Sequence, residues 1–143
     1  MQPKSIKRFD VFYLASLAAY VAGFFLGFDE TVALAREQYA AAGSDMDPTG
    51  LMTGIFVFWL ALSLLLWWLI SGKASNGAKW TLVALYVLLE LIGTIYSIAM
   101  GTVGDLSIGM GLSLLSIVLK GAAIFYLFQS DAVAWLERDK SAR

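Results

Sequence analysis

The chain has 143 residues, of which 59% are hydrophobic and 15% are charged, and its formal net charge is −1. Soluble domains average about 25% charged residues, and a net charge this close to zero points away from nucleic acid as a partner. The chain contains no Cys and no His. Disulfides, His-ligated haem, His/Cys zinc sites, Ser-His-Asp triads and cysteine nucleophiles are therefore excluded, and we expect neither a metal site nor a cofactor.

Four apolar runs, each about 20 residues or longer, dominate the sequence. They cover residues 9–28, 50–71, 79–100 and 106–128. An α-helix of about 20 residues crosses the hydrocarbon core of a bilayer. A soluble helix would keep a polar stripe, whereas FVFWLALSLLLWWLI at 56–70 offers only Ser63. The sequence thus predicts an all-α membrane protein, an antiparallel bundle of four transmembrane helices. The first run exceeds a signal-peptide core, so we expect it to be retained as a span.

The predicted outer loop, residues 29–49, is the only long connection. It carries five acidic residues and one Arg. Residues 31–42 favour helix, and they either extend the first helix outward or lie on the membrane surface. The acidic side chains could bind cations, but a solvated loop explains them more simply, because the D-x-D at 45–47 lacks the Gly and distal Glu of a calcium loop. Asp47 and Pro48 suit the N-cap and first position of the second span.

The distribution of Lys and Arg predicts the orientation of the spans. Positive residues favour the cytoplasmic side of a membrane. Eight flank the spans on one side, whereas the opposite side has only Arg36. The eight are Lys4, Lys7, Arg8, Lys73, Lys79, Arg138, Lys140 and Arg143. We therefore expect both termini to be cytoplasmic.

Tryptophans gather on that same side of the predicted bundle. Trp67, Trp68 and Trp80 flank the loop between the second and third spans, and Trp135 lies in a short amphipathic segment at 131–140. Indole rings favour the headgroup level of a bilayer. We interpret these four residues as interface anchors and the 131–140 segment as a cytoplasmic interfacial helix. A binding role for the tryptophans is the less favoured alternative.

Two ionisable residues lie deep inside predicted spans. Counting at about 1.5 Å per residue from the cytoplasmic side puts Glu90 roughly 16 Å deep and Lys120 roughly 12 Å deep. A lone charge there costs about 2.5–3.5 kcal/mol on insertion scales, so a partner is expected. Glu90 could accept a proton or cation as part of a polar site. We favour a structural role, either a Glu90–Lys120 ion pair or Lys120 reaching the headgroups beside a protonated Glu90.

Small residues recur at intervals of four in every span. Such rows let helix backbones approach closely. They fit packing within one chain, which we expect for the third and fourth spans, or association into a homo-oligomer. The rows are Gly23 and Gly27, Gly50 and Gly54, Gly93, Ser97 and Gly101, and Gly109 and Ser113.

Several segments on the cytoplasmic side form a recognisable pattern. They read SIKRFD at 5–10, LWWLI at 66–70, AKW at 78–80 and FQSDA at 128–132. The pattern resembles small uncharacterised four-helix membrane proteins of proteobacteria, over nearly the whole chain except the outer loop. The resemblance implies this architecture and a location in the bacterial inner membrane, but no chemistry.

The scarcity of reactive groups indicates a non-enzymatic membrane protein. We expect an accessory or assembly subunit of a larger membrane complex, or a homo-oligomer, with the lipid bilayer as its surroundings. The first alternative is a small transporter or channel that uses Glu90 and Lys120. Small multidrug transporters also have four helices, but their essential carboxylate is in the first span, where this chain has only Asp10 at the cytoplasmic edge. A membrane-embedded enzyme acting on lipid or quinone is least favoured.

Overall fold

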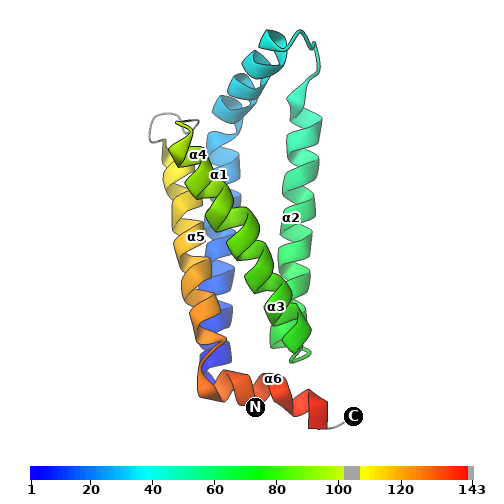
Figure 1. Ribbon diagram of the computed structural model, residues 1–143, viewed down its shortest axis with the longest axis vertical. Coiled ribbons are helices and arrows are strands. Elements are labelled where there is room, and N and C mark those ends of the chain that lie inside the picture. Colours follow the sequence, from blue (N-terminus) through cyan, green and yellow to red (C-terminus); the bar gives the residue numbers. More distant parts are fainter. Residues whose placement is uncertain (102–106, 142–143) are drawn as a thin grey trace.

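The computed structural model describes residues 1–101 and 107–141, and its regular elements are all helices. They are α1 (Lys4–Ala41), α2 (Pro48–Ser71), α3 (Asn76–Leu85), a π-helix (Tyr86–Leu91), α4 (Ile92–Ala99), α5 (Ile108–Tyr126) and α6 (Ser130–Ser141) (Figure 1). The segment from α3 to α4 is one continuous rod. Within the described residues, α1, α2, this rod and α5 are long and apolar enough to cross a membrane. The predicted all-α class with four candidate spans is confirmed to that extent.

The first helix continues well beyond its apolar run. α1 has 38 residues, which corresponds to about 57 Å at 1.5 Å per residue, against a hydrocarbon core of about 30 Å. Residues 29–41, which we assigned to the outer loop, are helical, so the connection to α2 is only residues 42–47. Of the two structures expected for residues 31–42, extension of the first helix is the one observed. Ala, Leu, Glu, Gln and Arg dominate this stretch and are strong helix formers.

Side-chain caps fix the starts of three helices. The carboxylate of Asp47 accepts from the Thr49 backbone N–H at 3.1 Å with Pro48 in the first helical position, as predicted. Ser75 caps α3 in the same way, and Ser107 caps α5. The Thr49 hydroxyl, then its backbone N–H, then Arg36 hold the pKa of Asp47 below its ordinary value, because hydrogen bonds to a carboxylate favour its charged form.

The helices pack closely at one end of the molecule and spread at the other. α6 runs across the end where both termini lie, and we call this the α6 end; the opposite end is the far end (Figure 1). α1 and α5 lie side by side. α2 runs beside α1 in the opposite direction, and its Phe56 ring stacks on the Phe24 ring of α1 with centroids 3.8 Å apart. The rod from α3 to α4 crosses from the α6 end of α2 to the far end of α5 (Figure 1).

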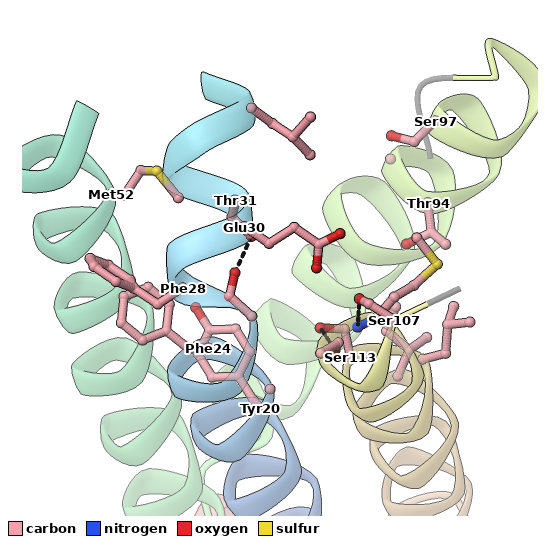
Figure 2. A pocket seen from close by; sticks show the side chains of 18 of the residues that line it. Tyr20, Phe24, Phe28, Glu30, Thr31, Met52, Thr94, Ser97, Ser107 and Ser113 are labelled. Atoms are coloured by element: carbon pink, nitrogen blue, oxygen red, sulfur yellow. Dashed lines mark hydrogen bonds between the residues drawn. The ribbon is translucent and has the colours of Figure 1, made fainter. Parts of the chain in front are cut away.

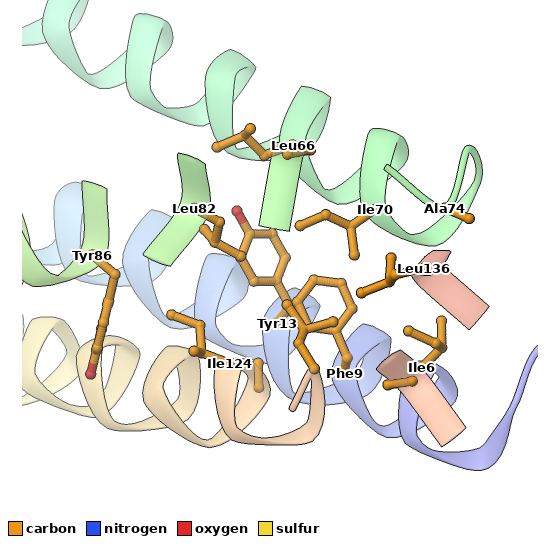
Figure 3. Close-up of a cluster of buried hydrophobic side chains, with 14 of the residues drawn as sticks. Ile6, Phe9, Tyr13, Leu66, Ile70, Ala74, Leu82, Tyr86, Ile124 and Leu136 are labelled. Carbon is orange, nitrogen blue, oxygen red and sulfur yellow. The ribbon is translucent and has the colours of Figure 1, made fainter. Parts of the chain in front are cut away.

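A buried apolar cluster fills the α6 end (Figure 3). α6 closes this cluster, because Ala132 and Leu136 are almost completely buried. The amphipathic segment predicted at 131–140 is thus helical, with its apolar face packed on the spans. The large side chains buried in the cluster are Ile6, Phe9, Tyr13, Ile70, Leu82, Ile124, Leu127 and Leu136.

Hydrogen bonds tie the N-terminal turn of α1 to its neighbours at this end. The carboxylate of Asp10 accepts from the Trp67 indole N–H and from the Ser71 hydroxyl, each at 2.9 Å. The Gln2 amide N–H donates to the Ser71 carbonyl oxygen at 2.9 Å. These bonds join α1 to the end of α2.

The four predicted interface tryptophans have different surroundings. Trp67 is held by Asp10 inside the α6 end. Trp68 and Trp80 are about half exposed, as an anchor requires. Trp135 packs against the cluster with the Arg138 guanidinium 3.8 Å from its ring centroid. Its buried indole N–H has no hydrogen-bond partner in the described part of the chain.

Candidate functional site

Glu90 and Lys120 form an ion pair between the third and fourth spans. Lys120 Nζ lies 2.5 Å from Glu90 Oε1. The Lys120 side chain is 8% exposed, whereas that of Glu90 is 30% exposed. The pair therefore neutralises a buried ammonium, which would be costly alone in a bilayer, while part of the Glu90 side chain stays exposed.

Glu90 lies in the π-helix, where the backbone departs from α geometry. The Ile92 backbone N–H donates to Val87 O, five residues earlier. A π turn holds an extra residue and often occurs at functional sites. The Tyr86 hydroxyl, at the start of the same segment, donates to the Ile117 carbonyl at 2.9 Å and so fixes the π-helix against α5. The sequence YVLLEL gave no signal for this irregular turn.

A layer of buried polar contacts lies beside the pair. The Ser116 hydroxyl, one turn before Lys120, donates to the Ser16 carbonyl of α1 at 2.8 Å. The Tyr13 hydroxyl donates to the Ser63 carbonyl of α2 at 3.0 Å. These bonds link α1 to α5 and to α2, and they satisfy hydroxyl groups that would be costly to bury unpaired.

A cavity of about 360 Å³ adjoins the pair. A second cavity of about 660 Å³ lies toward the far end. The two share five lining residues, so they adjoin each other; these are Tyr20, Leu89, Thr94, Ser113 and Ile117. Trp59 and Ser63 of α2 line the smaller part beside Glu90 and Lys120.

The larger cavity has two unlike walls. Phe24, Phe28 and Met52 form an apolar wall on α1 and α2 (Figure 2). Hydroxyl-bearing residues form the opposite wall on α4 and α5: Thr94, Ser97, Ser107 and Ser113 (Figure 2). Glu30 extends from α1 into the space between the walls (Figure 2), and within residues 1–101 and 107–141 it is the only charged residue in this lining.

The predicted glycine rows have different neighbours from those we expected. A Cβ on Gly109 would lie 3.0 Å from Gly27 Cα and 3.2 Å from the Gly23 carbonyl oxygen. The close approach is therefore between the first and fourth spans, rather than the third and fourth. A sequence cannot show which row faces which, because every row satisfies the same local pattern.

The small residues of the third span do not make a comparable contact. A Cβ on Gly93 would meet no atom within 4 Å. Gly93 and Ser97 instead line the larger cavity. Gly101 has a φ of +65° just after α4, a value that glycine adopts without strain. Gly50 and Gly54 in α2 also have open space around them.

The chemistry available at the site is limited to one carboxylate, one ammonium and several hydroxyls. In the stretches 1–101 and 107–141, no three His, Cys, Asp or Glu side chains are grouped to hold a metal ion. Comparison of the chain with protein-family models, with curated proteins and with solved structures found no match. The function is therefore inferred from the geometry of the site.

Proposed function

We propose that the chain is a small transporter or channel protein of the bacterial inner membrane that uses the Glu90–Lys120 pair. Its four spans form an antiparallel bundle with both termini in the cytoplasm. The observation that supports this proposal is that the pair borders a cavity of about 360 Å³ and leaves 30% of the Glu90 side chain exposed. A purely structural pair would be enclosed by packed side chains, which satisfy it at lower cost.

The pair gives an entering proton or cation a defined target. A proton delivered through the cavity would bind the Glu90 carboxylate, and the Lys120 ammonium would then lose its counter-ion. A buried ammonium without a partner is unfavourable, so protonation would favour a rearrangement that rehydrates or re-pairs Lys120. The π-helix carrying Glu90 is a suitable element to move, because its hydrogen bonds can shift register.

Flux measurements in proteoliposomes test the proposal. The wild-type protein should conduct protons or monovalent cations above protein-free liposomes, read with a trapped pH dye or a potassium-selective electrode. Glu90→Gln and Lys120→Met should lower the flux to the protein-free level. Glu37→Gln is the matched control, because Glu37 is exposed on α1 and lines neither cavity. Wild-type flux equal to that of protein-free liposomes would refute the proposal.

A second candidate is an accessory subunit or a homo-oligomer. It is favoured by α4, which buries no residue, and in which Ile95 and Tyr96 are each 64% exposed and line neither cavity. Lipid covers an apolar face as well as a protein does, which is why this candidate comes second. Purification from native membrane, followed by mass spectrometry of the intact complex, would show a stable partner or a second copy.

Reporter fusions test the orientation. Fusions at Gly77 and at the C-terminus should read cytoplasmic, and a fusion near Ser44 should read periplasmic. A periplasmic C-terminus would contradict the proposed topology.

A further inference from the structure

The Glu90–Lys120 pair has a closed side and an open side. Toward the α6 end, the Tyr13–Ser63 hydrogen bond comes first, and the buried apolar cluster follows. No buried member of that cluster lines either cavity. Packed side chains at protein density leave few spaces large enough for water, so this side forms a seal.

Toward the far end, the linings of the smaller and the larger cavity follow one another along the helices. Its lining extends from Lys120 to Ser107 on α5, which is 13 residues or roughly 20 Å. On α1 the lining extends from Tyr20 to Leu34, a similar distance of roughly 21 Å. The open side therefore reaches the start of α5 and comes within seven residues of the end of α1.

We infer that the two cavities form one hydrated vestibule, open at the far end and closed at the α6 end, through which small hydrophilic cations reach the Glu90–Lys120 pair. This inference rests on the proposed function and deepens it. It adds the face from which a solute approaches the same pair and the sign of the charge that the solute carries. The occupant is water carrying a cation, rather than a lipid chain.

The lining supports hydration of the vestibule. A buried water needs two to four polar partners, and the wall on α4 and α5 supplies the hydroxyls of Thr94, Ser97, Ser107 and Ser113. A volume of about 660 Å³ holds many waters, since each occupies about 30 Å³ of liquid. Ionisable side chains inside a bilayer typically face a water-filled cavity or a partner, and Glu90 has both.

The charges around the vestibule favour cations. Among the described residues, Glu30 is the only charged one that lines the larger cavity, and Asp29 precedes it on α1. The charges lining the smaller cavity are Glu90 from the π-helix and Lys120 from α5, which offset each other. A cleft lined by one sign of charge raises the local concentration of the opposite ion. The charges of the described residues therefore make the far-end half of the vestibule negative.

The absence of cysteine from the chain makes single-cysteine labelling a direct test. Thr94→Cys places a thiol in the lining of both cavities, and Ile95→Cys places one on the adjacent residue, 64% exposed and outside both linings. The probes are trimethylammonium-ethyl methanethiosulfonate and sulfonatoethyl methanethiosulfonate, a cationic and an anionic reagent that do not cross membranes. Sealed vesicles of each orientation, sorted by antibody access to a C-terminal epitope, expose one face at a time.

The cationic reagent should label Thr94→Cys when added to the far-end face and should leave it unlabelled from the α6-end face. Ile95→Cys should stay unlabelled from both faces, because its thiol lies in lipid. Rates are divided by those of a free thiol in solution. On this scale the cationic reagent should react faster than the anionic one. Glu30→Gln should lower that preference about twofold to fourfold, the range that Coulomb's law gives in water for one charge within about 10 Å.

Three results would overturn the inference. The first is a Thr94→Cys thiol that reacts fully after denaturation but from neither face before it, which would indicate a lipid-filled or collapsed groove. The second is labelling from the α6-end face. The third is a charge preference that Glu30→Gln leaves unchanged. Ser97→Cys repeats the test if Thr94→Cys does not fold. Far-end labelling without any flux would contradict the proposed function alone, and flux without labelling would contradict the vestibule alone.

Discussion

The α6-end half and the far-end half of this molecule differ in how completely side chains fill the spaces between helices. Near the α6 end, side chains from α1, α2, α3, α5 and α6 meet in one buried cluster. Toward the far end, the helices enclose a cavity of about 660 Å³, and α1 contacts α5 through its glycines and α2 through the stacked Phe24 and Phe56 rings. The Glu90–Lys120 pair lies where the two halves meet. A packed half can hold a charged pair in place while an open half gives it access to solvent.

The largest expected effect comes from breaking that pair. Glu90→Gln alone and Lys120→Met alone should each lower the free energy of unfolding by about 3 kcal/mol, because each leaves a buried group without its partner. The double mutant should recover part of the loss. Thermal unfolding in detergent or lipid measures all three, with Glu37→Gln as a surface control. If the two single effects simply add, the residues are uncoupled and the boundary between the halves carries no special interaction.

A pair of glycine substitutions compares tight and open packing directly. Gly109→Ala should destabilise the protein by about 1–3 kcal/mol, because the new methyl group presses on the backbone of α1. Gly93→Ala should be neutral, or stabilising by up to about 1 kcal/mol, because its methyl group meets open space and Ala is the better helix former. Equal effects in an unfolding assay would mean that the far half is packed more uniformly than the structure shows.

A hydroxyl deletion tests the polar layer that separates the halves. Tyr13→Phe removes the hydrogen bond to the Ser63 carbonyl and should cost about 1 kcal/mol. Tyr96→Phe is the matched control, since Tyr96 is 64% exposed in the far half, and it should change stability by less than about 0.5 kcal/mol. The same thermal assay distinguishes the two substitutions. If Tyr13→Phe is neutral, this polar layer does not contribute to the seal.

The smallest expected effect concerns the attachment of α6. The side chain and then the backbone N–H of Ser5 hold the pKa of Asp131 below its ordinary value, with the N–H 3.1 Å from the carboxylate. A lowered pKa stabilises the folded state above the unfolded pKa, and the contribution is lost as the pH falls through the folded pKa. Hydrogen exchange in α6 should therefore be constant from pH 7 to 5, after correction for the intrinsic rate, and should show added opening below about pH 4. Asp131→Asn should abolish this pH dependence, and an unchanged profile would show that Asp131 does not control the attachment.

The parts of the structure that sequence predicted are those set by local or one-dimensional rules. Apolar run length predicted four candidate spans, and the Asp47–Pro48 pair predicted the start of α2. A rise of about 1.5 Å per residue placed Glu90 and Lys120 at matching depths, and the structure joins them. Each of these features depends on positions along one helix.

The remaining features depend on which helices meet and how closely. Gly109 could have faced any small-residue row, and its contact with Gly27 becomes visible only in three dimensions. The cavities depend on how α2 and the rod from α3 to α4 lie against α1 and α5, which no local pattern encodes. Propensity alone could not decide whether residues 31–42 extend the first helix, since it is worth only tenths of a kcal/mol per residue.

The length of α1 has a practical consequence for mapping this protein in membranes. The C-terminal part of α1 carries Arg36, which is a trypsin site. In the sequence it is the only Lys or Arg between the first and second apolar runs or between the third and fourth. Trypsin added to that face should therefore make a single cut and release two fragments of fixed size. The cut lies within a helix, and Arg36 pairs with Asp47 at 3.3 Å, so digestion should be slow until the helix frays. The rate of this one cleavage would report the unwinding of the C-terminal part of α1 without any engineered label.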